Sequence, residues 1–321
     1  MTKIVFMGTP AFSTPILESL IEKYDVAAVM TQPDRPVGRK HVLTPSPVKK
    51  VALVHNIEVL QPEKVSKSPE MQRVIDIAPD FIVTAAFGQF LPTKLLKAAK
   101  IAAVNVHASL LPLYRGGAPV HYAIMNGDEE TGVSIMYMIR QMDAGNVISQ
   151  IKCPITQADD TGSMFDKLSL AGRDLLLKTL PTLIDGPVEG IKQDERAVTF
   201  SPNISRAQEE IDWTHTASEI DWQVRGLRPF PTAYVVMDNV RTKILDVTVL
   251  ADQQTTQMPG TVVSRTKHEL DVAAGQGTVL RINRLQPAGH PQMAITDFLN
   301  GADTQFEVGK QIMKMKFGAT N

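Results

Sequence analysis

Short runs of apolar residues alternate with helix-like patterns along the first half of the chain. Continuous apolar runs bounded by turn residues are typical of strands that are buried on both faces of a parallel sheet. Such runs lie at Lys3–Met7, Val26–Thr31, Phe81–Ala86, Ala102–Val106, Val133–Met138 and Val147–Ile151. The alternation of strand and helix predicts an α/β fold with an open, mostly parallel sheet.

Helices are predicted between these runs from their start signals. Serine caps a helix N-terminus, and proline suits the first turn because its missing N–H has no partner to lose there. Ser46-Pro47 and Ser68-Pro69 have this form, and Thr14-Pro15 starts a helix after the first strand. Met164–Leu183 has the amphipathic period of a long helix.

The pattern changes after about residue 185, where Asp185-Gly186-Pro187 ends the long helix. A mixed polar stretch follows, and beyond Gln208 the sequence becomes rich in short strand patterns separated by glycine and polar turns. The predicted strands are Thr232–Met237, Arg241–Val249, Gly260–Ser264, Glu269–Ala274 and Thr278–Arg284. Asp238-Asn239 is a plausible hairpin turn between the first two. The spacing predicts a small OB-like β-barrel, with a β-sandwich as the alternative.

Composition places the chain among globular proteins, because 43% of its 321 residues are hydrophobic and 21% are charged. This length is comfortable for two domains. A single cysteine, Cys153, excludes a disulfide framework and a cysteine-based zinc site. The apolar run Ile4–Met7 is too short for a signal peptide or a membrane span. We therefore expect a cytoplasmic protein with no membrane partner. We also expect a monomer.

The strongest chemical signal is the pair Asn105 and His107 at the end of an apolar strand. Alternate residues of a strand point to the same side, so an amide and an imidazole converge on one volume. Asp143 follows another predicted strand, and a carboxylate there would orient the imidazole and favour its charged form. Such a group binds an oxyanion and moves protons. The alternative is that Asn105 and Asp143 are turn residues and His107 is a satisfied strand-end histidine.

Several other chemistries lack their motifs in this sequence. There is no Gly-x-Ser-x-Gly elbow and no His-Glu-x-x-His sequence. The first turn, Met7–Ser13, has one glycine where a dinucleotide fingerprint needs three, and no Walker A lysine is present. These absences disfavour a serine hydrolase, a zinc hydrolase, a dehydrogenase and a P-loop enzyme.

A long proline-rich segment, Gln32–Val48, carries the basic residues Arg35, Arg39, Lys40 and His41. Long loops in compact domains are usually functional or mobile, and this cluster suits phosphates. The alternative is a solvated surface excursion. The formal net charge of −1 gives no general attraction for nucleic acid, so any such attraction must be local.

Three ordered blocks resemble the formyltransferase family that uses 10-formyltetrahydrofolate: Asn105–Pro112, Tyr114–Pro119 and Met142–Gly145. Further blocks resemble the members of this family that act on methionine carried by initiator tRNA. These blocks are Gly8–Pro10, Gln32–Arg35, Gly38-Arg39, Pro45–Lys49, Ala85–Gly88, Arg228–Ala233 and Leu285–Gly289. The resemblance covers essentially the whole chain.

The resemblance implies a Rossmann-like formyltransferase domain over residues 1–188, a linker over 189–207 and an OB-like, tRNA-binding domain over 208–316. Asn105, His107 and Asp143 match the catalytic trio of the family. The residues matched to folate contacts are Ser109, Leu110, Leu111, Pro112, Phe87 and Gly88. The residues matched to contacts with the acceptor end of the tRNA are Arg39 and Lys40.

The implied reaction is metal-independent transfer of a formyl group from 10-formyltetrahydrofolate, as co-substrate, to the amino group of methionine on initiator tRNA. Asn105 and protonated His107 would stabilise the oxyanion, and Asp143 would orient His107 and help to move the amine proton. The rivals are a formyltransferase for a small amine such as glycinamide ribonucleotide, a formyl-folate hydrolase and a non-catalytic tRNA-binding module. The added barrel favours a large acceptor.

Overall fold

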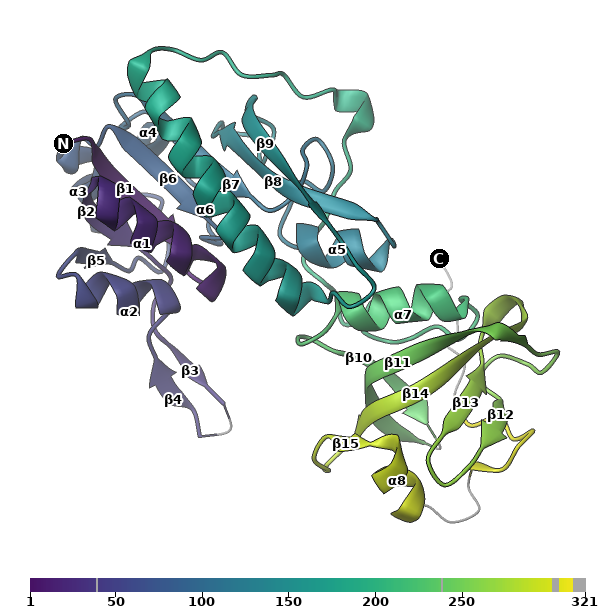
Figure 1. The fold of residues 1–321 in the computed structure, drawn as a ribbon. Helices are drawn as coiled ribbons and strands as arrows, with labels where there is room; N and C mark the ends of the chain where they lie inside the picture. The colour runs from purple at the N-terminus through teal and green to yellow at the C-terminus, as the bar shows by residue number, and fades with distance from the viewer. Residues whose placement is uncertain (39, 238, 302–305, 314–321) are drawn as a thin grey trace. The chain divides into compact units, whose positions relative to one another are not determined.

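The computed structural model describes residues 1–38, 40–237, 239–301 and 306–313 (Figure 1). Its internal contacts divide the chain into two units, neither of which is one continuous segment. Unit 1 comprises Met1–Pro119, Glu130–Pro154 and Met164–Pro202. Unit 2 comprises Val120–Glu129, Ile155–Ser163 and Asn203–Asn321.

The described part of unit 1 is built on a seven-stranded sheet of order β5-β2-β1-β6-β7-β8-β9. Its strands are β1 (Lys3–Gly8), β2 (Asp25–Met30), β5 (Glu58–Leu60), β6 (Phe81–Ala85), β7 (Ala102–His107), β8 (Glu130–Tyr137) and β9 (Val147–Pro154). The strands from β5 to β7 pair in parallel, whereas β8 and β9 are added antiparallel. The predicted open, mostly parallel sheet is confirmed.

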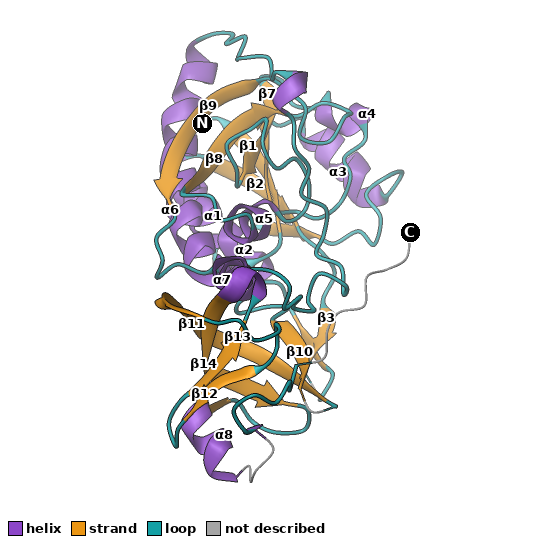
Figure 2. Cartoon of the chain, turned by 90° about the vertical axis from the view of Figure 1, so that its right-hand side faces the viewer, coloured by secondary structure: helices purple, strands orange, loops and turns teal. Residues whose placement is uncertain are grey.

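Helices cover both faces of this sheet, with α1 and α6 on one face and α3 and α4 on the other (Figure 2). The helices of this part of the chain are α1 (Thr14–Lys23), α2 (Pro47–Val54), α3 (Pro69–Ile77), α4 (Thr93–Leu96) and α6 (Thr161–Asp185), with a short 3-10 turn at Ala11–Ser13. Helix α5 (Pro119–Met125) follows β7 in the chain and, except for Pro119, belongs to unit 2. The predicted caps are confirmed, because the Ser46 and Ser68 hydroxyls each accept a backbone N–H three residues later, at 3.0 Å.

The apolar strands divide their side chains between the two faces. Val5 and Met7 of β1 and Ile82 of β6 pack in one cluster with Met71 and Val74 of α3. The intervening residues, such as Ile4 and Phe6, are equally buried. Each fully buried side chain of this kind contributes about 1.5–3 kcal/mol relative to exposure. Burial on both faces explains why these strands are continuously apolar.

Unit 2 contains an antiparallel sheet of order β10-β11-β14-β13-β12, with β15 paired to β14. Its strands are β10 (Ala233–Met237), β11 (Val240–Gln254), β12 (Val262–Arg265), β13 (Leu270–Ala273), β14 (Thr278–Pro287) and β15 (Met293–Ala294). Helices α7 (Ala217–Gly226) and α8 (Ile295–Gly301) accompany them. The predicted hairpin of β10 and β11 is present, although Asp238 of its turn lies outside the described residues.

The two edge strands of the described sheet are joined through a segment near the C-terminus. Met313 forms a bridge to Met237 at the end of β10, and Gln311 forms a bridge to Thr261 next to β12. The backbone N–H groups of Ile312 and Met313 also donate to the carbonyl of Gly260. This incomplete closure is compatible with the predicted OB-like barrel.

Two inserted segments complete unit 2. Gly127, with φ of +73°, lies where a Cβ atom would meet the Trp222 ring at 2.6 Å, so this approach requires glycine. Thr161 donates its hydroxyl to the carbonyl of Gly226, and Arg225 donates to the carbonyl of Asp159. Unit 2 therefore depends on chain from both sides of β8 and β9. Among the described residues, no helix has the length and apolar character needed to cross a membrane.

Candidate active site

Asn105 and His107 lie at the carboxyl end of β7, the edge at which open α/β sheets bind ligands. Their alternate positions place both side chains on the same side of the strand. His107 is 5% exposed, and Asn105 is partly exposed. The structure thus places these two residues in the strand-end positions that the sequence predicted.

The amide of Asn105 is oriented by a neighbouring strand. Thr84 pairs with Asn105 in the β6–β7 register, and its hydroxyl donates to Asn105 Oδ1 at 2.7 Å. Because the oxygen is engaged, the NH₂ group faces away from Thr84. Within the described residues, Asn105 Nδ2 has no hydrogen-bond acceptor. This nitrogen is thus available to donate to a bound oxyanion.

The ring of His107 is held from both nitrogens. Nε2 lies 3.0 Å from the Tyr114 carbonyl, and Nδ1 lies 3.8 Å from Asp143 Oδ1. A carbonyl only accepts hydrogen bonds, so Nε2 carries a proton in this arrangement. Nδ1 is therefore the nitrogen that remains for proton exchange with a substrate.

Asp143 comes from the loop after β8, where its φ of +50° places it in the left-handed region. The backbone N–H of Gly116 donates to Asp143 Oδ2 at 3.0 Å and fixes that oxygen. Gly116 is itself tightly placed, because a Cβ atom there would meet the Ser201 carbonyl at 2.6 Å. Asp143 therefore lies next to His107 although it comes from a loop distant in sequence. The backbone N–H of Gly116 holds its carboxylate there.

The segment Ser109–Pro112 follows β7 directly and is fastened to β8. Ser134 donates its hydroxyl to the carbonyl of Ser109 at 2.6 Å and accepts the N–H of Leu111 at 3.1 Å. The Ser109 hydroxyl donates to the Leu113 carbonyl at 2.7 Å. Leu110 and Pro112 remain partly exposed beside the strand end. This segment is a fixed edge of the candidate site.

Phe87 and Gly88 follow the end of β6, next to β7. The carbonyl of Phe87 accepts hydrogen bonds from the Thr9 hydroxyl and from Gln32 Nε2, both at 3.1 Å. Gly88 has φ of +84°, and a Cβ atom added to it would lie 3.5 Å from Gln32 Nε2. The loop therefore lies at the same sheet edge as Asn105, with the ring of Phe87 buried.

The basic segment has a structure that the sequence did not predict. Strands β3 (Arg35–Val37) and β4 (Val42–Thr44) form a two-stranded hairpin that projects from the sheet of unit 1 (Figure 1). Lys40 lies exposed in its turn, whereas Arg39 lies outside the described residues. At the base of the hairpin, Lys49 forms an ion pair with Asp34 at 2.7 Å. In the described structure, Lys40 makes no contact with the Asn105–His107–Asp143 group.

Sequence reasoning missed several residues that support the site. Thr84 was one polar residue in an apolar strand, which was a signal of a role at the strand end. Ser134 was a similar signal in β8. Gln193, which contacts the Asp143 loop, lies in a polar stretch whose sequence has no pattern pointing to the site.

Chemically, the site offers a donor from Asn105 Nδ2, an exchangeable position at His107 Nδ1 and a carboxylate at Asp143. This combination suits a reaction that develops negative charge on a carbonyl oxygen and moves a proton between two nitrogens. It contains no activated nucleophile of its own. The arrangement favours direct transfer between two bound molecules.

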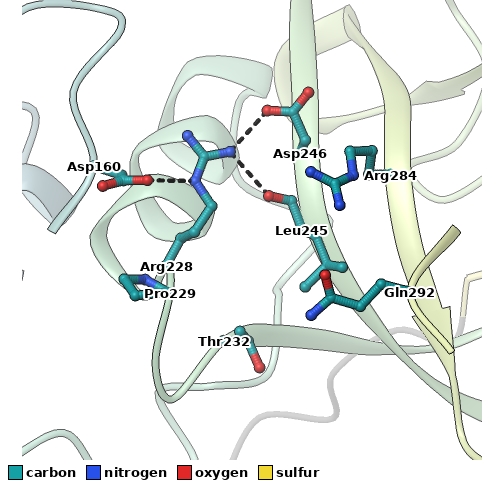
Figure 3. A pocket seen from close by; sticks show the side chains of 8 residues that line it. All are labelled: Asp160, Arg228, Pro229, Thr232, Leu245, Asp246, Arg284 and Gln292. Carbon is teal, nitrogen blue, oxygen red and sulfur yellow. Dashed lines mark hydrogen bonds and ion pairs between the residues drawn. The ribbon is translucent and has the colours of Figure 1, made fainter. Parts of the chain in front are cut away.

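A separate cavity of about 530 Å³ lies within unit 2 and is lined in part by Asp160, Arg228, Asp246 and Arg284 (Figure 3). Arg228 forms ion pairs of 2.8 Å with both Asp160 and Asp246. Burial opposes the charge of Arg228, but the hydrogen bonds that it donates to the two carboxylates outweigh this effect, so the pKa of this guanidinium is raised. These carboxylates leave the cavity without a net positive charge, and it holds none of the predicted catalytic residues.

Comparison with protein families identifies the family of the chain. The model of the formyl transferase family matches residues 2–180, and that of the formyl transferase C-terminal domain matches residues 203–303. The chain belongs to the formyl transferase family. The family member is 65% identical to the methionyl-tRNA formyltransferase of Lactiplantibacillus plantarum, over 98% of this chain and 99% of that protein. It is 64% identical to the methionyl-tRNA formyltransferase of Enterococcus faecalis, over 94% and 96%.

Solved structures share the fold of this formyl transferase at lower identity. A sugar 3N-formyl transferase crystallised with dTDP and 5-N-formyl-THF superposes with a TM-score of 0.68 and 19% identity. The match covers 91% of this chain and 99% of that one. The predicted family is therefore confirmed, and so is the two-part architecture of an open sheet followed by an antiparallel β domain.

Proposed function

We propose that this chain transfers the formyl group of 10-formyltetrahydrofolate to the amino group of methionine on initiator tRNA. The proposal rests on one observation above all, the convergence of Asn105, His107 and Asp143 at the end of β7. The acceptor follows from the name that relatives at 54–65% identity share. The cytoplasm is the compartment in which both substrates would be met, and we expect the chain to act as a monomer.

In this reaction the amine nitrogen attacks the formyl carbon, and the carbonyl oxygen becomes an oxyanion. Asn105 Nδ2 and a proton on His107 Nδ1 donate to this oxygen. Breakage of the bond between the formyl carbon and N10 of the folate releases the product, while the amine proton passes to N10. Asp143 orients His107 and takes part in this proton movement, directly or through one water.

The two substrates use different parts of the chain. Residues 1–188 carry the transfer chemistry, and the folate lies along Ser109–Pro112 and the Phe87–Gly88 loop, which flank Asn105. Arg39 and Lys40 approach the acceptor end of the tRNA, where phosphates attract cations. Residues 208–316 bind the body of the tRNA. The chain's formal charge of −1 makes these local cations the main source of attraction.

The direct test is transfer of labelled formyl from 10-formyltetrahydrofolate to methionyl-tRNA, beside glycinamide ribonucleotide and a tube without acceptor. Label on the tRNA alone is the expected result. Label on the small amine would replace the acceptor, and formate released in every tube would indicate a hydrolase. Absence of any formyl consumption would contradict the proposal.

The role of His107 has its own test. His107→Ala should lower kcat by about 10²-fold or more, the usual scale of lost acid–base or oxyanion assistance. Thermal unfolding of the variant shows whether it is folded. Unchanged kcat in a folded variant would contradict the assignment of His107.

A further inference from the structure

The chain that follows α6 returns along the edge of the sheet and borders the active site. This returning segment, residues 188–202, lies within unit 1. Its Ile191 exchanges two backbone hydrogen bonds with Val147, at 2.7 and 2.9 Å. Further along, Thr199 accepts the N–H of Arg115 and Ser201 donates its N–H to the Arg115 carbonyl. The returning segment is thus hydrogen-bonded both to β9, the strand that follows Asp143, and to Arg115, the residue that precedes Gly116.

Gln193 of the returning segment reaches the Asp143 loop. Its Nε2 donates to the carbonyls of Asp143 and Gly145, each at 2.8 Å. The side chain is buried, with 6% exposed. A buried amide with two carbonyl partners holds its position, because breaking either bond leaves a polar atom unsatisfied away from water.

The orientation of the Gln193 amide is fixed by Arg115. The guanidinium donates from Nε to Gln193 Oε1 at 2.9 Å, and because a guanidinium only donates, the oxygen must face it. Arg115 is 2% exposed and is charge-balanced by Glu195 at 2.9 Å. The hydrogen bond from Arg115 lowers the pKa of the Glu195 carboxyl. The NH₂ group is consequently aimed at the Asp143 loop.

The Asp143 loop needs such support. Asp143 is a non-glycine residue in the left-handed region, and Gly145 lies where a Cβ atom would meet the Tyr137 carbonyl at 1.9 Å. The carboxylate can face His107 only while this backbone conformation is kept. We propose that Gln193 is a positioning residue for formyl transfer: by binding the carbonyls of Asp143 and Gly145, it sets the Asp143 carboxylate opposite His107. This inference rests on the proposed function, in which Asp143 takes part.

The test is Gln193→Met, which keeps the length of the side chain and removes its donors. A misplaced group at a reacting centre costs up to about 100-fold, so we expect kcat to fall about 10- to 100-fold. Because Gln193 lies behind Asp143 in the proposed site, KM for the folate and for methionyl-tRNA should each stay within about twofold. Unchanged kcat would overturn the inference.

A double-mutant cycle separates positioning from simple loss of stability. If Gln193 acts through Asp143, Gln193→Met should lower kcat in the natural chain and have no further effect in the Asp143→Ala background. An equal loss in both backgrounds, while Asp143→Ala alone lowers kcat, would overturn the inference and leave the proposed function standing. Full kcat in Asp143→Ala would overturn the role of Asp143 and the inference together.

A matched control is available in unit 2. Gln223 likewise donates from Nε2 to two backbone carbonyls, those of Gln208 and Glu210, at 2.8 and 3.1 Å. Gln223→Met should lower thermal stability but leave kcat unchanged, both in the natural chain and in the Asp143→Ala background.

If Gln193→Met does not fold, Gln193→Glu keeps the side-chain shape and the Arg115 partner but removes the donors. Its kcat should fall in the same way, and unchanged kcat in this variant would also overturn the inference.

Discussion

Single side chains in the site are held by groups that do not themselves react. Asn105 illustrates this, because an amide can present either its oxygen or its nitrogen to a ligand. The Thr84 hydroxyl selects the nitrogen by donating to Oδ1 at 2.7 Å. Thr84 is 4% exposed, so this hydrogen bond lies away from bulk water. The proposed oxyanion contact thus depends on a residue of the neighbouring strand.

Replacement of Thr84 by valine tests this dependence. Thr84→Val keeps the side-chain shape and removes the hydroxyl, so the Asn105 amide can turn its oxygen toward the reacting carbonyl. We expect kcat to fall about tenfold, a fraction of the loss seen when an oxyanion donor is deleted. Steady-state transfer kinetics measure this. Thr84→Ser, which retains the hydroxyl, should be close to the natural chain, and equal losses in both variants would contradict the argument.

At the scale of elements, the parallel strands were predictable because burial on both faces makes them continuously apolar. The positions of Asn105 and His107 were predictable as polar residues at a strand end, whereas Asp143, predicted at another strand end, lies in the loop after β8. The β3–β4 hairpin was not, because its strands have three residues each and are largely exposed. Helix α7 was also missed, although Thr216 and Glu219 have the spacing of a capping box at its N-terminus. The contacts of Gln193 could not be predicted, since they join positions about 50 residues apart through tertiary packing.

The capping box gives a prediction for α7. The Thr216 hydroxyl accepts the N–H of Glu219, and the Glu219 carboxylate accepts the Thr216 N–H in return. Thr216→Ala removes this cap and should lower the free energy of unfolding by about 1 kcal/mol. Urea unfolding, followed by tryptophan fluorescence from Trp213 and Trp222, measures the change. Ser218→Ala, in the same first turn, is the matched control and should be nearly neutral, and an equal effect in the two variants would contradict the cap.

At the scale of the whole molecule, pH acts on unit 2 through His121 of α5. Burial lowers the pKa of His121 below its ordinary value of 6.5, although a hydrogen bond with the Phe230 backbone raises it in part. The unfolded chain therefore takes up this proton first as pH falls, so the stability present above pH 6.5 is lost below it. In His121→Gln, the melting temperature should fall less steeply between about pH 7 and about pH 5. These two values lie roughly on either side of the pKa of a histidine in an unfolded chain. An unchanged slope would contradict this, and above about pH 7.5 the two proteins should differ by a constant amount.

The discontinuity of unit 2 leads to a prediction about cutting the chain. A fragment that begins at Asn203 contains all strands of the described barrel but lacks the segments Val120–Glu129 and Ile155–Ser163. It loses the packing of Gly127 on Trp222 and the ion pair that Asp160 makes with partly buried Arg228. Arg228 keeps its ion pair with Asp246 but loses the one with Asp160, and the Trp222 ring is uncovered. Each of these losses costs on the order of 1–3 kcal/mol, a large share of the stability of a small domain. The fragment should therefore unfold at a clearly lower urea concentration than unit 2 in the full chain, or without a cooperative transition.

Asp160→Ala in the full chain removes only the ion pair between Asp160 and Arg228 and should give an intermediate loss of stability. A fragment as stable as the full chain would show that the two inserted segments contribute nothing to the barrel, which their contacts with Trp222, Arg225 and Arg228 argue against.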